Sequence, residues 1–267
     1  MNQPRVCLTV AGLDPSGGAG IVADLNTFSA FGCFGAAAIS SITFQNTTGV
    51  FGAEHQTGET VRRQVEPIFA DYTVAAAKTG MLPTRDVIET TASLFGPTGI
   101  PLVVDPVVRS TSGFDLIDNP ALLSLIEQMF PLATLITPNI PEAERISGIA
   151  IENEQDIRDA AGIMRKQGAR NVLIKGGHFD APQSMARDFL FAGDTLHILE
   201  AEYINTTATH GTGCTLAAAI TANLALGNDL AGSVRAAKEF VTKAIRTSPG
   251  LGKGHSPINH LVHRQGE

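Results

Sequence analysis

The chain has 267 residues, 43% of them hydrophobic and 17% charged, which is enough for one large α/β domain or two small ones. A net charge of −7 argues against nucleic acid or an anionic membrane as the main partner. No stretch reaches the ~20 apolar residues of a membrane span, and no basic region precedes a long apolar run at the N-terminus. The three cysteines are widely spaced, as in proteins of reducing compartments, so we expect a cytoplasmic protein.

The first part of the chain predicts alternating strands and helices. A short β-branched run predicts a buried strand, and a glycine-containing loop leads from it into a helix that ends near Phe31. Thr57 is a candidate cap for the next helix, which Pro67 would disturb near its end. The strands expected here are residues 5–12, 34–44 and a polar edge strand at 50–55.

Four later apolar runs each end on polar residues before a turn or a helix. The runs are residues 74–77, 101–104, 134–136 and 171–174. The polar residues that follow them include Lys78, Asp105, Asn139 and Lys175. Helical patterns between the runs predict right-handed crossovers and a mainly parallel sheet. Each polar residue could be an ordinary loop residue. Together they favour a ligand site, because ligands bind at the carboxyl ends of parallel strands.

The pattern changes in the last third of the chain. Two short strands, at 188–191 and 195–199, surround a turn at Gly193 and predict a hairpin that forms a lid or extends the sheet. A last helix at 233–245 carries Lys238. An earlier helix has a clear start at Asn153 and a stop at Gly168. Because no linker, repeat or low-complexity tract interrupts the chain, we expect a single domain over residues 1–267.

A glycine-containing turn, T-H-G-T-G-C-T at residues 209–215, precedes an alanine-rich segment that is apolar all round. Such a segment predicts a buried helix, and its free first-turn amides form an anion site. A thiol at this terminus, that of Cys214, has reason to ionise below its usual pKa of about 8.5. The alternative is a turn before a core helix, with Cys214 as a small buried hydrophobe. His210 can be an ordinary loop histidine.

These features suggest phosphoryl transfer on an unusual scaffold, because the chain has neither a dinucleotide fingerprint nor a phosphate loop. Asp105 and Glu142 are oxygen ligands suited to Mg²⁺, directly or through water. Lys175 or Lys238 could balance nucleotide charge. The amides that would face the migrating phosphoryl group are those of Gly211, Thr212, Gly213 and Cys214.

A series of motifs along nearly the whole chain makes the sequence recognisable. It resembles the hydroxymethylpyrimidine/phosphomethylpyrimidine kinases of thiamine synthesis, in the ribokinase-like superfamily. The resemblance implies an ATP- and Mg²⁺-dependent kinase with a three-layer α/β/α ribokinase-like fold, a mainly parallel sheet and a homodimeric assembly. The motifs are A-G-L-D-P-S-G-G-A-G-I, T-F-Q-N-T, K-T-G-M-L, V-D-P-V, T-P-N-I-P-E-A-E, I-K-G-G-H, T-H-G-T-G-C-T and G-H-S-P-I-N-H, which in this order are highly specific.

The resemblance also implies roles for individual residues. Cys214 stands where ribokinase relatives carry a catalytic aspartate, and would accept the proton of the substrate's primary alcohol. Gln45 would hydrogen-bond the aminopyrimidine edge, although Met81 beside it could equally be a core residue. The other residues implied for the substrate pocket are Asp24 and Gly12. Asn139 and Glu142 would face the nucleotide phosphates and Mg²⁺. Lys175 and Thr212 would contact ATP.

The chain departs from the family pattern at several positions. Leu13 and Val22 replace the usual hydroxyl residue and glutamine of the first loop, and V-R-S-T at 108–111 replaces Met-Val-Ala-Lys. Asn205 and Ala208 also differ from the common residues before the anion site. These differences concern the substrate loop and lid, and they bear on the second phosphorylation, that of the monophosphate, more than on the first.

Two other functions compete with this interpretation. A pyridoxal kinase of the same superfamily also reads Gly-x-Gly-Cys, but Gln45 in T-F-Q-N-T argues for the pyrimidine. A non-catalytic pyrimidine-binding module would have no need of the anion site formed by the glycines before Cys214.

Overall fold

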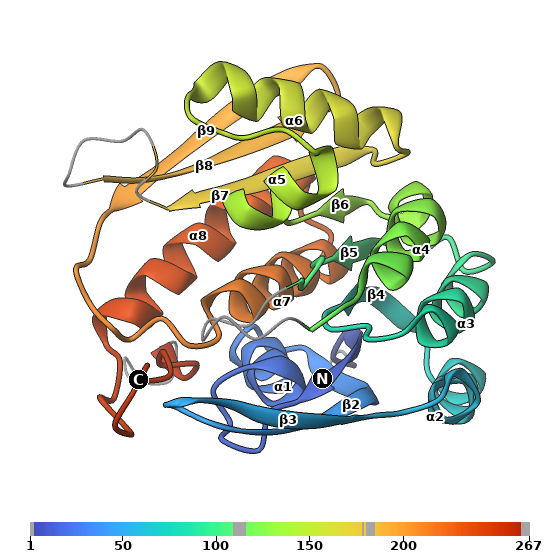
Figure 1. The fold of residues 1–267 in the computed structure, drawn as a ribbon. Coiled ribbons are helices and arrows are strands. Elements are labelled where there is room, and N and C mark those ends of the chain that lie inside the picture. The colour runs from blue at the N-terminus through green and yellow to red at the C-terminus, as the bar shows by residue number, and fades with distance from the viewer. Residues whose placement is uncertain (1–2, 109–115, 178, 180–184, 263–267) are drawn as a thin grey trace.

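A computed structural model describes residues 3–108, 116–177, 179 and 185–262 of the chain. The strands of these residues form one nine-stranded sheet in the order β3-β2-β1-β4-β5-β6-β7-β8-β9 (Figure 1). The strands are β1 (Val6–Leu13), β2 (Phe34–Asn46), β3 (Gly49–His55), β4 (Val74–Thr79), β5 (Leu102–Val104), β6 (Leu135–Ile136), β7 (Asn171–Gly177), β8 (Met185–Ala192) and β9 (Thr195–Glu202).

The middle of the sheet is parallel, as the sequence predicts. Strands β2, β1, β4, β5, β6 and β7 pair in parallel, whereas β3 at one edge and β8 and β9 at the other pair antiparallel. The central strands are buried on both faces, which explains their continuous apolar runs. The hairpin β8–β9 continues the sheet beyond β7, so the sheet-extension alternative is the correct one.

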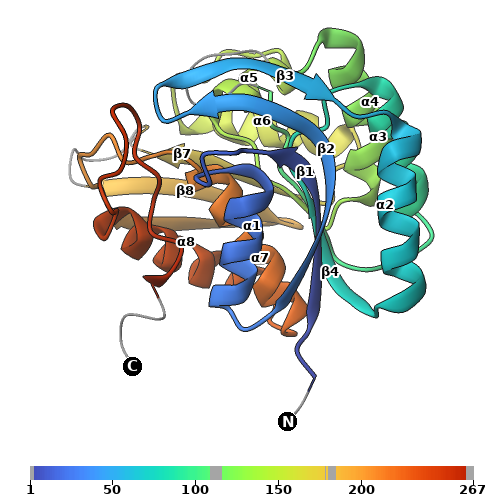
Figure 2. The same ribbon diagram turned by 90° about the horizontal axis from the view of Figure 1, so that it is seen from below.

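Helices cover both faces of the sheet (Figure 2). The resulting three-layer α/β/α arrangement confirms the predicted fold class. On one face lie α1 (Gly20–Ala30), α7 (Thr212–Ala225) and α8 (Leu230–Arg246). On the other lie α2 (Gly58–Asp71), α3 (Arg85–Phe95), α4 (Asn119–Met129), α5 (Ile140–Ser147) and α6 (Glu154–Lys166), with a 3-10 turn at Phe130–Leu132.

Local signals place several helix ends where they were expected. The Thr57 side chain accepts a hydrogen bond from the Thr60 amide and caps α2. Asn153 caps α6, and Gly168 follows that helix with a φ of 110°. Pro67 lies inside α2, which runs on to Asp71, so the proline does not end the helix.

Helix α7 is the central element of its layer. It packs between α1 and α8 and against β4, and nearly all of its side chains beyond the first turn are buried. This confirms the buried helix predicted from its uniformly apolar sequence. No helix in the described ranges is long and apolar enough to cross a bilayer.

The segment that follows α8 folds back over the loop between β2 and β3. The His255 amide donates to the Thr47 carbonyl at 2.7 Å, and the Gly254 amide lies 3.3 Å from the Thr47 hydroxyl. The His210 amide donates to the Ser256 carbonyl at 3.3 Å. The C-terminal segment therefore joins the end of β2 to the loop that precedes α7.

Candidate active site

A cavity of about 910 Å³ lies at the carboxyl ends of the parallel strands. Its walls come from β1, β2, β7, the loops after β4 and β5, and the starts of α5 and α7. All the predicted site residues except Asp24 line it, namely Gly12, Gln45, Met81, Asp105, Asn139, Glu142, Lys175, Gly211, Thr212, Gly213, Cys214 and Lys238. The topology therefore brings together residues that the sequence places far apart.

The start of α7 has the backbone geometry that the predicted anion site requires. Gly211 is its N-cap, with a φ of 84°, and a Cβ there would overlap the carbonyl oxygen of Gly18, so only glycine fits. In the part of the chain that the structure describes, no side chain caps this terminus, which leaves first-turn amides for a ligand. A Cβ on Gly213 would lie 3.2 Å from Lys175 Nζ. The backbone can therefore approach a phosphate held by that lysine.

Cys214 lies in the first turn of α7 with its side chain half-buried at the cavity wall. The backbone amide of Gly20, at the start of α1, favours the thiolate of Cys214. Burial nevertheless raises the pKa of Cys214 to about 11, and the charges of Asp24 and Asp105 act in the same direction. The expectation of a lowered pKa is therefore wrong for the free protein, although the Lys78 charge opposes the rise.

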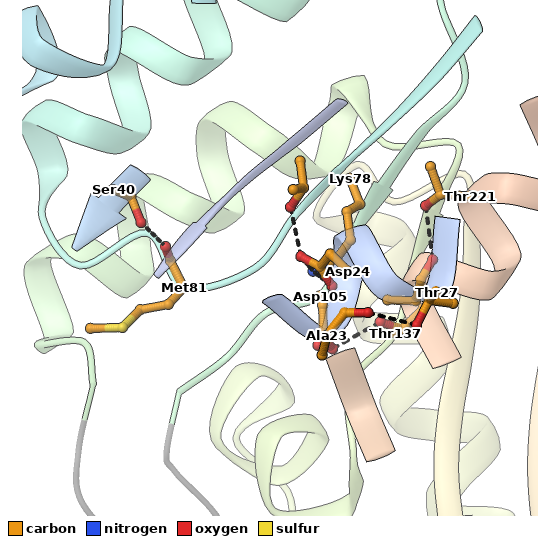
Figure 3. A network of polar contacts seen from close by, with 11 residues as sticks. Ala23, Asp24, Thr27, Ser40, Lys78, Met81, Asp105, Thr137 and Thr221 are labelled. Carbon is orange, nitrogen blue, oxygen red and sulfur yellow. Dashed lines mark hydrogen bonds and ion pairs between the residues drawn. The ribbon is translucent and has the colours of Figure 1, made fainter. Parts of the chain in front are cut away.

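A lysine and two carboxylates form the other side of the cavity. Lys175 Nζ lies 2.9 Å from Asp105 Oδ1 and 3.9 Å from Glu142 Oε2. The Thr137 hydroxyl also donates to Asp105 Oδ1, at 2.9 Å (Figure 3). Burial alone would lower the pKa of Lys175, but the two carboxylates raise it, so the lysine is charged. Burial raises the pKa of Glu142 to about 7, against the opposing effect of Lys175.

Asn139 and Glu142 occupy the cavity wall because they cap α5. The Glu142 amide donates to Asn139 Oδ1 and the Asn139 amide donates to Glu142 Oε2, both at 2.8 Å. This reciprocal capping box fixes both side chains at the start of the helix. The residues that the resemblance assigns to nucleotide and metal thus also have a structural role.

The carboxylates suit Mg²⁺ but do not form a complete metal cage. No cluster of three or more His, Cys, Asp or Glu side chains able to hold a metal occurs among the described residues. Mg²⁺ usually keeps waters and substrate phosphates beside one or two carboxylates, so Asp105 and Glu142 fit that donor set. The hydrogen bonds of Asp105 from Thr137 and Lys175 both use Oδ1, and Oδ2 faces Gly213.

Gln45, Met81 and Gly12 line the part of the cavity beside β1 and β2. Gln45 Nε2 donates to the Thr43 hydroxyl at 2.7 Å, and that hydroxyl donates to the Leu13 carbonyl at 2.9 Å. This chain of bonds orients the carboxamide, and the sequence reasoning missed Thr43. Met81 is nearly buried, and a Cβ on Gly12 would lie 3.2 Å from its sulfur.

Asp24 is the one predicted substrate residue that the structure keeps away from the cavity. Its side chain is fully buried and pairs with Lys78, with the Lys78 nitrogen 2.9 Å from Asp24 Oδ2 (Figure 3). The Thr9 hydroxyl donates to the same oxygen at 2.7 Å. The expectation that Asp24 meets the ligand is corrected accordingly, because α1 points this side chain into the protein.

Asp14 and His210 form a pair that sequence reasoning did not assign. His210 Nε2 lies 2.8 Å from Asp14 Oδ2, which also accepts a hydrogen bond from the Ala19 amide at 2.9 Å. Burial would raise the pKa of Asp14, but bonds from His210 and Ser16 lower it overall. The pair fixes the first loop against the start of α7. The Asp-Pro-Ser turn in the sequence was the available signal for Asp14.

Lys238 reaches the cavity from α8 and is held by a second missed residue, Asp188 on β8. Lys238 Nζ lies 2.6 Å from Asp188 Oδ2, and the Gly176 amide donates to Asp188 Oδ1 at 3.1 Å.

Of the positions that depart from the family pattern, Val108 and Ala208 are buried and Asn205 is exposed. The other residues of V-R-S-T, at 109–111, and His178 of the I-K-G-G-H motif lie outside the described residues.

Comparisons with known proteins identify the family of this chain. The phosphomethylpyrimidine kinase family matches residues 14–259. The hydroxymethylpyrimidine/phosphomethylpyrimidine kinase of Haemophilus influenzae is 43% identical over 98% of this chain and 99% of its own. The thiamine biosynthesis bifunctional protein ThiED of Geobacter sulfurreducens is 44% identical over 96% of this chain, which spans 52% of that protein.

A solved structure confirms the ribokinase-like fold. An ADP complex of Bacillus subtilis pyridoxal kinase superimposes with a TM-score of 0.88 at 38% identity, covering 98% of this chain and 100% of that one. The sequence relatives and the family match extend over nearly the same residues as the motifs of this chain. The chain belongs to the phosphomethylpyrimidine kinase family.

Proposed function

We propose that this kinase transfers the γ-phosphoryl group of ATP to 4-amino-5-hydroxymethyl-2-methylpyrimidine, and then to the resulting monophosphate, in thiamine diphosphate synthesis. The observation that carries the proposal is one cavity lined by Gln45, by Cys214 and the first-turn amides of α7, and by Lys175 with its carboxylates. The thiamine context is supported by the ThiED relative.

The residues that line the cavity suggest the chemistry of the first transfer. Cys214 accepts the proton of the substrate's hydroxyl while that oxygen forms a bond to the γ-phosphorus. The bond from the γ-phosphorus to the bridging oxygen breaks, and ADP leaves with the electron pair. The first-turn amides beyond Gly211 stabilise the charge on the transferring group. Cys214 can accept this proton only in its thiolate form, so neighbouring groups that stabilise the thiolate affect the rate.

Charged residues support the nucleotide. Lys175 and Lys238 are positioned to neutralise the phosphates, with Asn139 and Thr212 beside them. Asp105 and Glu142 would hold Mg²⁺, which supplies charge neutralisation on the phosphates when bound.

A substrate panel tests this proposal. The protein is incubated with Mg-ATP and either hydroxymethylpyrimidine, its monophosphate or pyridoxal, and products are identified by mass spectrometry. We expect a mono- and then a diphosphate from the pyrimidine alcohol. ATP hydrolysis without a phosphorylated pyrimidine would contradict the proposal, and an absence of ATP turnover would favour a non-catalytic binding module.

Pyridoxal phosphorylation is the second candidate, and the superposition on Bacillus subtilis pyridoxal kinase favours it. The aminopyrimidine offers a donor and a ring acceptor side by side, which a carboxamide such as Gln45 can match. Pyridoxal lacks this pair, and an unpaired buried group costs about 1–3 kcal/mol, roughly 5- to 150-fold in kcat/KM. Gln45→Met should erase most of the pyrimidine preference. A wild-type preference for pyridoxal would overturn the assignment.

We further propose a cytoplasmic homodimer. Phe44 and Phe51 are exposed on β2 and β3 at the sheet edge, where a second copy of the chain could cover them. Light scattering after size-exclusion chromatography measures the mass, and replacing both phenylalanines with serine should yield the monomer.

A further inference from the structure

The Thr43 hydroxyl connects the protein backbone to the Gln45 carboxamide on the cavity wall. Thr43 and Gln45 are two positions apart on β2, so their side chains share a face of the strand, and both residues line the cavity. The Thr43 hydroxyl lies 2.9 Å from the Leu13 carbonyl oxygen, and Gln45 Nε2 lies 2.7 Å from the Thr43 hydroxyl oxygen. Thr43 is 4% exposed, so its hydroxyl is largely shielded from water.

The direction of these two hydrogen bonds follows from the number of hydrogens. A hydroxyl has a single hydrogen, and a main-chain carbonyl oxygen can only accept. The Thr43 hydrogen therefore points to Leu13, and the hydroxyl offers Gln45 a lone pair. A donor must meet this lone pair, so the Nε2 end of the carboxamide faces Thr43 and Oε1 cannot take its place. Because the acceptor on Leu13 is a main-chain atom, the family departure at this position leaves the arrangement unchanged.

A carboxamide held by its nitrogen presents a fixed pattern to the cavity. Gln45 Oε1 accepts, and Nε2 keeps one hydrogen for a ligand because Thr43 takes the other. A ring with an exocyclic amine beside an unprotonated ring nitrogen matches this pattern. A ring with an exocyclic oxygen beside an N–H has donor and acceptor exchanged, and its oxygen would meet Oε1. Turning the carboxamide to suit that ring would set Oε1 against the Thr43 lone pair.

We propose that Thr43 is a positioning residue that makes the site select a 4-aminopyrimidine over the corresponding 4-oxopyrimidine, by fixing which end of Gln45 meets the ring. This inference rests on the proposed function, in which Gln45 contacts the pyrimidine edge. It adds a discrimination between two rings of nearly the same shape, which the apolar lining of the cavity cannot supply.

The test compares two alcohols that differ in this edge alone, hydroxymethylpyrimidine and its 4-oxo analogue. Binding of each ring is measured by calorimetry, and kcat/KM is measured with Mg-ATP. We expect wild type to prefer the amine by roughly tenfold or more, because the oxo ring leaves buried polar groups unpaired. Thr43→Val keeps the shape and removes the hydroxyl, so this preference should fall by roughly threefold or more. Thr43→Ser keeps the hydroxyl and should restore it.

Two further variants separate orientation of the carboxamide from a structural effect. Thr91→Val on α3 removes a buried hydroxyl that donates to the Val87 carbonyl at 2.6 Å, outside the cavity lining, and should leave the preference unchanged. Because Thr43 acts through Gln45, Thr43→Val should have no effect on the preference in a Gln45→Ala background. If Thr43→Val does not fold, Thr43→Ala removes the same hydroxyl and decides in its place.

Each outcome bears on one proposal or the other. An unchanged preference in Thr43→Val, or an equal fall with and without Gln45, would overturn the role of Thr43. Wild-type protein that phosphorylates both rings equally well would leave the kinase function standing and overturn the selection. Wild-type protein that phosphorylates neither ring would refute the proposed function, and the calorimetric ratio would still test Thr43. Binding of neither ring would overturn both.

Discussion

Cys214 is subject to two opposing influences. The starts of α1 and α7 favour its thiolate, as does Lys78, while burial and two carboxylates favour the thiol. The sequence shows the helix terminus but not the carboxylates, which come from distant segments. This is why the expected lowering of the pKa did not appear, although the position of the thiol was predicted.

Replacing Cys214 with alanine tests its role directly. We expect kcat to fall roughly 10²-fold or more, the usual scale for a positioned general base. Pyrimidine binding, measured by calorimetry, should persist, because the proposed ring contacts are with Gln45 and Met81 rather than with the thiol. Equal kcat values for Cys214→Ala and wild type would reduce the residue to a packing role.

Gly211 tests the anion site without removing a functional group. Gly211→Ala forces a side chain into a left-handed conformation, at about 1–2 kcal/mol, and against the Gly18 carbonyl. Gly148→Ala is the matched control, since its φ is 78° and its Cβ would meet open space. Both variants should lose stability in urea titrations, but only Gly211→Ala should lower kcat, by roughly tenfold or more. Equal kinetics in the two variants would contradict the anion site.

At the scale of elements, capping explains how α5 presents two side chains to the cavity. Asn139→Ala removes one half of the capping box and should cost about 1 kcal/mol of stability. Asn153→Ala does the same at α6, outside the cavity, and serves as the control. We expect similar losses in urea titrations and a raised KM for ATP only in Asn139→Ala. A raised KM in both would show that the nucleotide effect is indirect.

Periodicity and turn chemistry were sufficient to predict most elements. The alanine-rich run gave α7, the apolar runs gave β4 to β7, and the family motifs gave most of the cavity residues. Contacts between distant side chains could not be predicted in this way. Lys78 pairs with Asp24, which is 54 positions away in the sequence, and Lys238 pairs with Asp188, which is 50 positions away. These pairs therefore depend on how whole elements pack together.

At the scale of the whole molecule, the C-terminal segment contributes a buried histidine. His260 Nε2 has no hydrogen-bond partner among the described residues, and burial with the nearby His210 charge lowers the pKa of His260 to about 4. The unfolded ring takes up its proton near pH 6.5. Between these values the unfolded chain binds more protons, so stability falls as the pH falls.

This predicts an acid-sensitive fold. From pH 6.5 towards pH 4 the group removes up to about 1.4 kcal/mol per pH unit from the free energy of unfolding. His260→Phe should flatten this part of the curve, measured by urea titration at several pH values. Parallel curves for the two proteins would mean that other groups cause any acid sensitivity.

The contacts of Thr47 with residues 254 and 255, and of His210 with Ser256, also bear on how the protein is made. On the ribosome, segments fold in the order in which they emerge. The strands, the anion site and the ring-binding wall can all form while residues 254–260 are still within the ribosome. The bonds that join these parts form only after residues 254–260 have emerged, so we expect the newly made chain to gain its kinase activity only after that.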